Sequence, residues 1–184
     1  MNGYRMPAQI QGEWIWKNSL LKHPESFLLM RKEFVCTSVE LETNLWISAN
    51  CSYQLFINGR LVGFGPRAHQ NCGASYVDLH EVTYYLESGI NVIAVLVYHN
   101  IEQGGCNRHV PGLWCQMEAH GRVLLCSDQS WIIRDGSCFC GPRPRISRDR
   151  GKCHFFNAAN SPLNWITPVF LPDAEWMHPD HMTE

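Results

Sequence analysis

Apolar residues occupy every second position in several short stretches of the chain. In residues 44–49 and 53–57, the positions that share one face of an extended backbone are Leu45, Ile47, Ala49, Tyr53, Leu55 and Ile57. An alternation with a period of two is typical of a β-strand that turns one face toward a core. Both stretches are therefore predicted to be strands.

Two dipeptides between apolar runs predict tight hairpins. Asn58-Gly59 separates YQLFI from RLVGF, and His120-Gly121 separates GLWCQMEA from RVLLCS. A type I′ turn requires two residues that tolerate positive φ, so the runs flanking Asn58-Gly59 are predicted to pair as antiparallel strands, and the second pair of runs likewise. Pro66 follows the first hairpin, and because proline lacks a backbone N–H, strand pairing is expected to end there.

The longest apolar run lies at residues 90–99. It is rich in β-branched residues and apolar at both parities, which predicts a strand in the middle of a sheet with both faces covered. The preceding residues 82–89 are expected to form one helical turn or a wide loop closed by Gly89. Short strands with glycine-rich turns, and no long amphipathic helix, predict an all-β fold of the antiparallel β-sandwich or jelly-roll type.

After Trp131 the alternation fades. Residues 134–165 are rich in Gly, Pro and Arg, which is typical of a long surface excursion, and residues 171–184 have no apolar period to anchor them. We therefore expect residues 11–135 to form the sandwich core. Residues 136–184 are expected to form a long, irregular, loop-rich extension that completes the sandwich and leads toward a following domain.

Composition and charge narrow the class of protein. The 184 residues suit one domain, and 45% hydrophobic with 17% charged residues is typical of a soluble globular protein. A net charge of −2 gives no electrostatic reason to expect nucleic acid or an anionic membrane as a partner. The basic residues between 143 and 152 are interpreted as a solvated loop or a domain-docking surface.

The N-terminal residues lack the pattern of a signal peptide, and no apolar run is long enough to span a bilayer. We expect a cytoplasmic protein, or a periplasmic one if a leader has been removed. The odd number of cysteines, nine, also favours a reducing compartment. Several cysteines lie in strand-like apolar runs, where a reduced thiol packs as a small hydrophobic group: Cys36, Cys51, Cys115 and Cys126.

Two pairs of residues have the spacing of metal ligands. His69 with Cys72, and Cys106 with His109, would make a tetrahedral zinc site if their two loops meet. Such spacings arise by chance in a chain with many cysteines and histidines. Ordinary loop residues are the favoured interpretation, so no metal and no cofactor is expected.

Several motifs in order carry a resemblance to a known family. They are WIW (14–16), RKEF (31–34), LWISANCSYQLFINGRLVGFGPR (45–67) and YYLESGINVIAVLVYHN (84–100). They resemble the amino-terminal β-sandwich of bacterial α-L-rhamnosidases, a jelly roll similar to galactose-binding domains. HFFNAANSPLNWITPVF (154–170) and AEWMHP (174–179) resemble the segment that follows this sandwich. The resemblance covers most of residues 11–176.

The resemblance implies that the chain is a non-catalytic module. In that family the inverting hydrolysis of α-L-rhamnosides takes place in a separate helical (α/α)6 barrel, and such chemistry needs two carboxylates about 6.5–9.5 Å apart across the sugar. The implied role is to pack on or support the catalytic domain, so the expected partners are the catalytic and other domains of the same parent polypeptide. Glu81 and Asn157 depart from the family pattern, because aspartates are expected there, whereas Asp78 keeps an earlier acid.

The alternative is an independent carbohydrate-binding module that recognises rhamnose-containing glycans. A sugar site needs an exposed aromatic face together with planar hydrogen-bonding groups. The candidate residues are Arg67, His69, Tyr76, Arg108, His109 and Trp114. Tryptophans in strand-like segments are more often core or interface residues than sugar platforms.

The loop that follows the first hairpin suggests a contact with another domain. Gly63 and Gly65 permit the chain to bend, and Arg67 and His69 come directly afterwards. Our hypothesis is that this loop packs on a neighbouring domain. It is wrong if Arg67→Ala leaves both the stability and the activity of the full-length protein unchanged.

Overall fold

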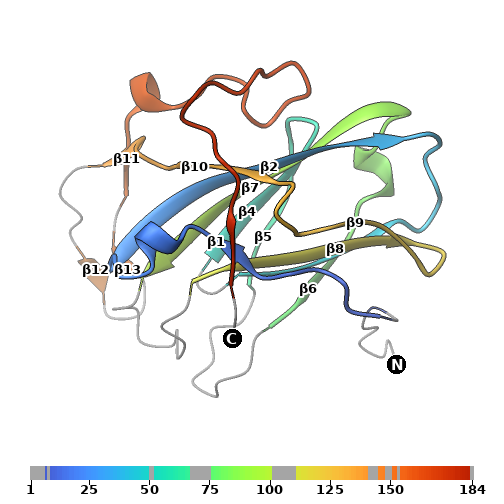
Figure 1. Ribbon diagram of the computed structural model, residues 1–184, viewed down its shortest axis with the longest axis horizontal. Coiled ribbons are helices and arrows are strands. Elements are labelled where there is room, and N and C mark those ends of the chain that lie inside the picture. The colour runs from blue at the N-terminus through green and yellow to red at the C-terminus, as the bar shows by residue number, and fades with distance from the viewer. Residues whose placement is uncertain are drawn as a thin grey trace.

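The computed structural model describes residue 7 and residues 9–49, 52–66, 76–100, 111–140, 145–147, 151–152 and 154–182. These residues form two antiparallel sheets packed as a β-sandwich (Figure 1), so the predicted fold class is confirmed. The helices of this described part are three single 3₁₀ turns, none of them long or apolar enough to cross a membrane. They are η1 (Asn18–Leu20), η2 (Thr83–Tyr85) and η3 (Ala158–Asn160).

Sheet A has the strand order β15-β1-β8-β3-β6, and β9 also pairs with β8. Its strands are β1 (Ile15–Trp16), β3 (Asn44–Ala49), β6 (Asp78–Glu81), β8 (Leu113–Ala119), β9 (Arg122–Cys126) and β15 (Asp180–His181). The red strand β15 brings the end of the described chain back beside β1 near its beginning (Figure 1).

Sheet B has the strand order β10-β2-β7-β4-β5. Its strands are β2 (Glu25–Cys36), β4 (Ser52–Ile57), β5 (Arg60–Gly65), β7 (Gly89–Asn100) and β10 (Ile132–Asp135). Strand β7 pairs with β2 on one side and with β4 on the other, which confirms the predicted central strand at residues 90–99. The expected helical turn before it is η2.

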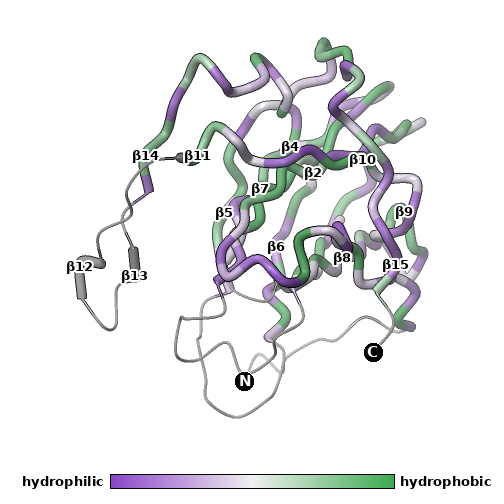
Figure 2. The backbone as a smooth tube through the Cα atoms, turned by 60° about the vertical axis from the view of Figure 1, so that its left-hand side comes forward, coloured by the Kyte–Doolittle hydropathy of each residue, from purple (hydrophilic) through white to green (hydrophobic). Residues whose placement is uncertain are grey.

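Two short ladders lie outside the sheets. Strand β11 (Phe139–Cys140) pairs with β14 (Phe155–Phe156), and β12 (Arg145–Ser147) pairs with β13 (Gly151–Lys152). Both ladders belong to the C-terminal extension, and the β11–β14 ladder lies at one side of the sandwich (Figure 2).

Both predicted hairpins form. Asn58 and Gly59 have φ angles of 50° and 81°, and the corresponding angles at His120 and Gly121 are 50° and 75°. Two successive positive φ values are the geometry of a type I′ turn. Strand β5 ends at Gly65, directly before the proline, as expected.

Asparagine side chains tie the first hairpin to the central strand. The Asn58 amide donates to Asn91 Oδ1 at 2.7 Å, and Asn58 Oδ1 accepts from the Val92 N–H at 2.9 Å. Asn91 is fully buried and donates to the Glu87 carbonyl at 2.7 Å. The asparagines of the FING and GIN motifs therefore specify the fold, because each closes a turn with its side chain.

The hydrophobic core lies between the sheets. All six residues predicted to face inward belong to it, namely Leu45, Ile47, Ala49, Tyr53, Leu55 and Ile57. Trp16 and Trp131 are fully buried members of the same core. The hydrophobic stretches of β2, β4 and β7 run through this layer (Figure 2).

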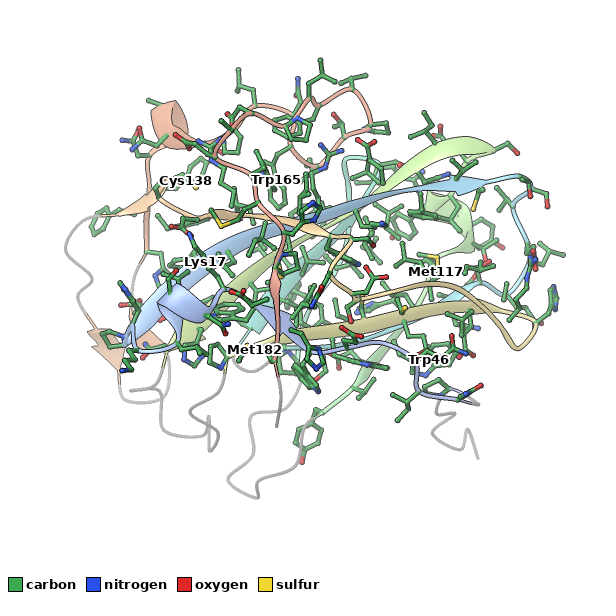
Figure 3. All side chains as sticks on the ribbon, viewed as in Figure 1. Lys17, Trp46, Met117, Cys138, Trp165 and Met182 are labelled. Carbon is green, nitrogen blue, oxygen red and sulfur yellow. The ribbon has the colours of Figure 1, made fainter. Side chains whose placement is uncertain are left out.

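The outer face of β3 and β8 in sheet A is buried too, which the alternation alone did not predict. Trp46, labelled in Figure 3, and Trp114 point away from the core yet are almost inaccessible to solvent. The N-terminal segment lies on this face: Gln116 Oε1 accepts from the Gln11 N–H at 2.7 Å, and the Trp114 indole donates to the Gly12 carbonyl at 2.9 Å. The N-terminal segment makes these contacts with polar groups, so its sequence has no apolar period that would predict them.

The C-terminal extension is anchored mainly by its backbone. Met177 and Ile133 exchange two backbone hydrogen bonds, at 2.7 and 3.0 Å, and β15 pairs with β1. Trp176 is the buried side chain beside this anchor. Residues 171–184 lack an apolar period that would predict this anchor, and backbone pairing does not require one.

Candidate functional site

Two of the six predicted sugar-site residues lie in the described part of the chain. Tyr76 is half-buried, two residues before β6, and Trp114 is buried on the outer face of sheet A. Arg67, His69, Arg108 and His109 lie outside the described residues, as do Cys72 and Cys106 of the zinc alternative. The six-residue site therefore stays a prediction, and the burial of Trp114 favours a structural contact for that member.

A polar cluster joins the two sheets beside the first hairpin. The Tyr53 hydroxyl on β4 donates to Asp78 Oδ2 at 2.7 Å and lies 2.9 Å from His80 Nε2. Asp78 and His80 are on β6, opposite the inward-facing residues Ile47 and Leu45 of β3, so both point toward sheet B. The cluster therefore bridges the sandwich.

Two glycines of β5 make room for this bridge. A Cβ at Gly63 would meet the His80 ring, and a Cβ at Gly65 would meet the Asp78 carboxylate and the Tyr53 hydroxyl. The glycines that sequence reasoning assigned to a bend thus allow close approach of polar side chains. Because Tyr53 is buried, the cluster is suited to holding the start of β6 rather than to catalysis on a ligand.

An aromatic group that sequence reasoning missed packs on the outer face of sheet B. The Phe27 ring stacks on Phe139 and Tyr98, with centroids 4.4 and 4.6 Å apart, and the His154 ring meets Phe27 edge-on at 4.9 Å. The Tyr98 hydroxyl donates to Glu25 Oε1 at 2.8 Å. The only sequence signal was the HFF triplet, since rings from four separate segments meet here.

The buried cation Arg31 fixes the C-terminal segment to β2. Its guanidinium donates to Glu33 Oε1 at 2.7 Å and to the Phe170 carbonyl at 3.3 Å, and it stacks on the Phe170 ring at 4.9 Å. Burial lowers the pKa of Arg31, and the charge of Glu33 opposes that shift. Arg31 belongs to the RKEF motif, so this motif specifies packing of the extension.

Two tryptophans complete this cover. The Trp165 ring, labelled in Figure 3, lies 6.3 Å from those of Phe56 and Trp176, and Phe170 lies 5.4 Å from Trp176. These rings cover the part of sheet B formed by β10 and β2. The contact of Trp165 with Phe56 on β4 is the edge of this cover.

A polar cleft of about 480 Å³ opens beside the cover. Arg134 of β10 pairs there with Asp173 at 3.0 Å and with Glu175. The remaining lining residues are Ser137, Ala159, Asn160, Ser161 and Pro162. The two carboxylates are held by one guanidinium, and no aromatic ring lines the cleft, so its chemistry is that of a surface ion-pair network.

Asn157 closes the turn next to this cleft. Its side chain accepts a hydrogen bond from the Ala159 N–H at 3.1 Å and so caps η3. Asparagine and aspartate are equally good N-caps. The departure from the family pattern at this position therefore preserves the local fold.

Four cysteines are free thiols, namely Cys36, Cys115, Cys126 and Cys138. Burial raises the pKa of each, most of all for the fully buried Cys115, where the neighbouring Cys126 adds to the effect. Within the described ranges, no group of three or more His, Cys, Asp or Glu residues could hold a metal ion.

Comparison with solved structures relates the fold to glycoside hydrolases. A rhamnosidase of the GH78 family from Bacillus sp. GL1 superposes with a TM-score of 0.81 at 28% identity, over 95% of this chain and 19% of that enzyme. An α-L-rhamnosidase from Dictyoglumus thermophilum superposes with a TM-score of 0.73 at 18% identity, over 97% of this chain and 22% of that enzyme. The chain thus spans about a fifth of these relatives. No protein-family model and no curated protein sequence matches it.

A lectin shares the fold at lower similarity. The Pleurotus ostreatus lectin, solved in complex with GalNAc, gives a TM-score of 0.53 at 14% identity, over 96% of this chain and 45% of the lectin. The chain therefore resembles a β-sandwich part of α-L-rhamnosidases and also a lectin. The resemblance inferred from the motifs is supported in this coarser form.

Proposed function

We propose that the chain is a non-catalytic β-sandwich module of a larger α-L-rhamnosidase-like glycoside hydrolase, in which it packs on or supports the catalytic domain. One observation carries the proposal: the chain matches a rhamnosidase over 95% of its own length at 28% identity, and yet over only 19% of the enzyme. In this proposal the chemistry lies in the remaining four-fifths of the parent polypeptide.

The internal contacts of the described residues agree with a supporting role. Tyr53, Asp78 and Arg31 are engaged in contacts that join one sheet to the other or to the extension. The motifs that carried the family resemblance likewise map to turns and packing. A scaffold that presents a rigid surface to a neighbour needs such contacts, whereas it needs no reactive group.

The lectin similarity favours a second candidate function. An independent carbohydrate-binding module would bind rhamnose-containing glycans without any other domain. Its predicted contacts are the six loop and strand residues named from the sequence, two of which are Tyr76 and Trp114. Under this alternative, isothermal titration of the purified chain with L-rhamnose and rhamnosylated glycans gives a saturable heat.

Activity measurements on two samples test the proposal. The purified 184-residue chain is expected to leave an aryl α-L-rhamnoside intact. The native gene product, captured from its source cells with an antibody against this chain, is expected to hydrolyse it. A native product without this activity contradicts the proposal, and so does turnover by the purified chain alone.

The cellular compartment is part of the proposal. We propose a reducing environment such as the cytoplasm, because the chain has an odd number of cysteines, nine. Alkylation of unfolded protein from source cells under non-reducing conditions is expected to label all nine cysteines. Labelling of fewer would indicate disulfides and an oxidising compartment.

A further inference from the structure

We propose, on the basis of the function proposed above, that the outer face of β4 and β5 is the surface on which a neighbouring domain of the same polypeptide docks. This β4–β5 face is formed by Gln54, Phe56, Leu61, Phe64 and Leu96.

Strand register places these five side chains together. Gln54 is paired directly with Phe64 and Phe56 with Leu61 across the hairpin, and Gln54 is also paired with Leu96 of β7. Residues directly opposite each other in an antiparallel ladder project on the same side of the sheet. The alternate residues of β4 are in the core, so the face points away from it.

The face is apolar and open. Phe64 is 72% exposed and Leu61 is 53% exposed, while Phe56 and Leu96 are partly buried beside them. Single exposed apolar residues are normal on a soluble protein, but a contiguous group marks an interaction site. A second exposed apolar pair, Val35 and Ile90, lies near one end of β2 and β7.

The chain's own C-terminal segment stops at the border of this face. Trp165 packs edge-on against Phe56, and the Gly59 N–H donates to the Ile166 carbonyl at 2.8 Å. From there the segment turns toward Arg31, where Phe170 is held. The covered and open parts of sheet B are therefore continuous, with Trp165 at the boundary.

Chain length and charge point to another domain of the same polypeptide as the occupant. The rhamnosidases that the chain matches are about five times longer, so under the proposed function most of the polypeptide remains to be packed against this module. The face itself carries no charge. The nearby cation Arg60 donates to the Tyr84 carbonyl at 2.8 Å and lies 4.6 Å over the Tyr85 ring, so it is already engaged.

These features define the chemistry of the partner surface. Aliphatic or aromatic side chains of the neighbouring domain would cover Phe64 and Leu61, and a backbone or amide group would pair with the Gln54 amide. Such contacts match the apolar centre and polar rim of a domain interface.

Site-specific photo-cross-linking of the native gene product tests this assignment. The change Phe64→p-benzoylphenylalanine is introduced in the complete gene, and Tyr84→p-benzoylphenylalanine serves as the matched control. Tyr84 is also aromatic and 76% exposed, but it lies on η2 outside the face. Cross-linked peptides are then identified by mass spectrometry after illumination.

We expect position 64 to cross-link to peptides of the same polypeptide that lie outside residues 1–184, and position 84 to give none. A long native product whose position 64 gives no such cross-link overturns the surface assignment and leaves the proposed function standing. Cross-links between two copies of residues 1–184, or to a bound glycan, also overturn it. A native product of 21.1 kDa contradicts the proposed function itself.

A thermal measurement gives an independent readout. Phe64→Ser is expected to lower the unfolding midpoint of the complete native product, because the docked domain loses its contact with the ring. The same change is expected to leave the midpoint of the isolated chain unchanged, and Tyr84→Ser is expected to leave both unchanged. Equal shifts in the isolated and complete proteins would contradict the docking of a domain at Phe64.

Discussion

Two parts of the outer face of sheet B differ in how they are covered. Over β2 and β10 lies the C-terminal segment, with Phe170 and Trp176 packed on the sheet and the buried Arg31 holding the segment's backbone. Over β4 and β5 nothing in the described chain continues this layer beyond Trp165, and Phe64 is 72% exposed. Both parts are apolar, and among the described residues a cover lies over only one of them.

The difference separates the contacts that the chain makes for its own stability from the face on which we propose that a neighbouring domain docks. A sandwich buries its inner faces by packing its two sheets, but each outer face needs a separate cover or must tolerate water. Sheet A solves this with the polar N-terminal segment on Trp114 and Gln116. In sheet B the C-terminal segment covers β2 and β10, and the β4–β5 face is the surface proposed to bind a neighbouring domain.

The largest expected effect lies in the covered part. Trp176→Ala removes a buried ring that contacts Trp165 and Phe170, so the free energy of unfolding should fall by about 3 kcal/mol. Urea unfolding of the purified chain measures this. The control Leu171→Ala, at a side chain that is 87% exposed in the same segment, should change it by less than about 0.5 kcal/mol. Equal effects would mean that the cover does not fold together with the sandwich.

A smaller effect is expected beneath the open part. Tyr53→Phe removes the hydroxyl that bridges Asp78 and His80, and the free energy of unfolding should fall by about 1–2 kcal/mol. Tyr84→Phe makes the same chemical change at an exposed ring and should have no effect. If the two variants unfold at the same urea concentration, the bridge does not stabilise the junction of β4 and β6.

The buried thiol of Cys115 predicts a dependence on pH. Burial raises its pKa, so the folded state keeps the proton when the unfolded state loses it. Stability from this group is therefore complete below the unfolded thiol pKa of about 8.5 and falls above it, by up to about 1.4 kcal/mol per pH unit. Between pH 8 and 10, urea unfolding of Cys115→Ala in reducing buffer should lose stability less steeply than the wild type. If the free energy of unfolding falls equally steeply with pH in Cys115→Ala and in the wild type, the buried Cys115 thiol is not the source of the pH dependence.

The smallest expected effect lies on the open face. Leu61→Ser replaces a 53% exposed side chain and should change the free energy of unfolding of the isolated chain by less than about 0.5 kcal/mol. A loss of about 2 kcal/mol or more, typical of a buried leucine, would show that the chain itself covers this position. Comparing this change in the free energy of unfolding with that of Trp176→Ala measures how differently the two parts of sheet B contribute to the stability of the chain.

The fold could be predicted from sequence wherever local chemistry decides it. Asn58-Gly59 and His120-Gly121 adopt the positive φ that a two-residue hairpin turn requires, and the alternation around Leu45 and Leu55 follows from the pleat of a strand. The tail was missed, because the pairing of Met177 with Ile133 uses backbone groups that every residue carries.

The candidate site was less predictable for a different reason. Tyr53, Asp78 and His80 come from two strands in different sheets, so only the folded structure brings them together. Gly65 was interpreted as a bend, although its missing Cβ is what lets Asp78 reach Tyr53. The open β4–β5 face likewise depends on where the C-terminal segment stops, which the spacing of residues 163–171 does not encode.

The mass of the native gene product tests the central claim most directly. An antibody raised against this chain, used on an immunoblot of source cells, should detect a band several times larger than 21.1 kDa, because the module is proposed to be part of a longer hydrolase. A single band at 21.1 kDa would contradict the claim. The chain would then be free-standing, and glycan binding would become its leading function.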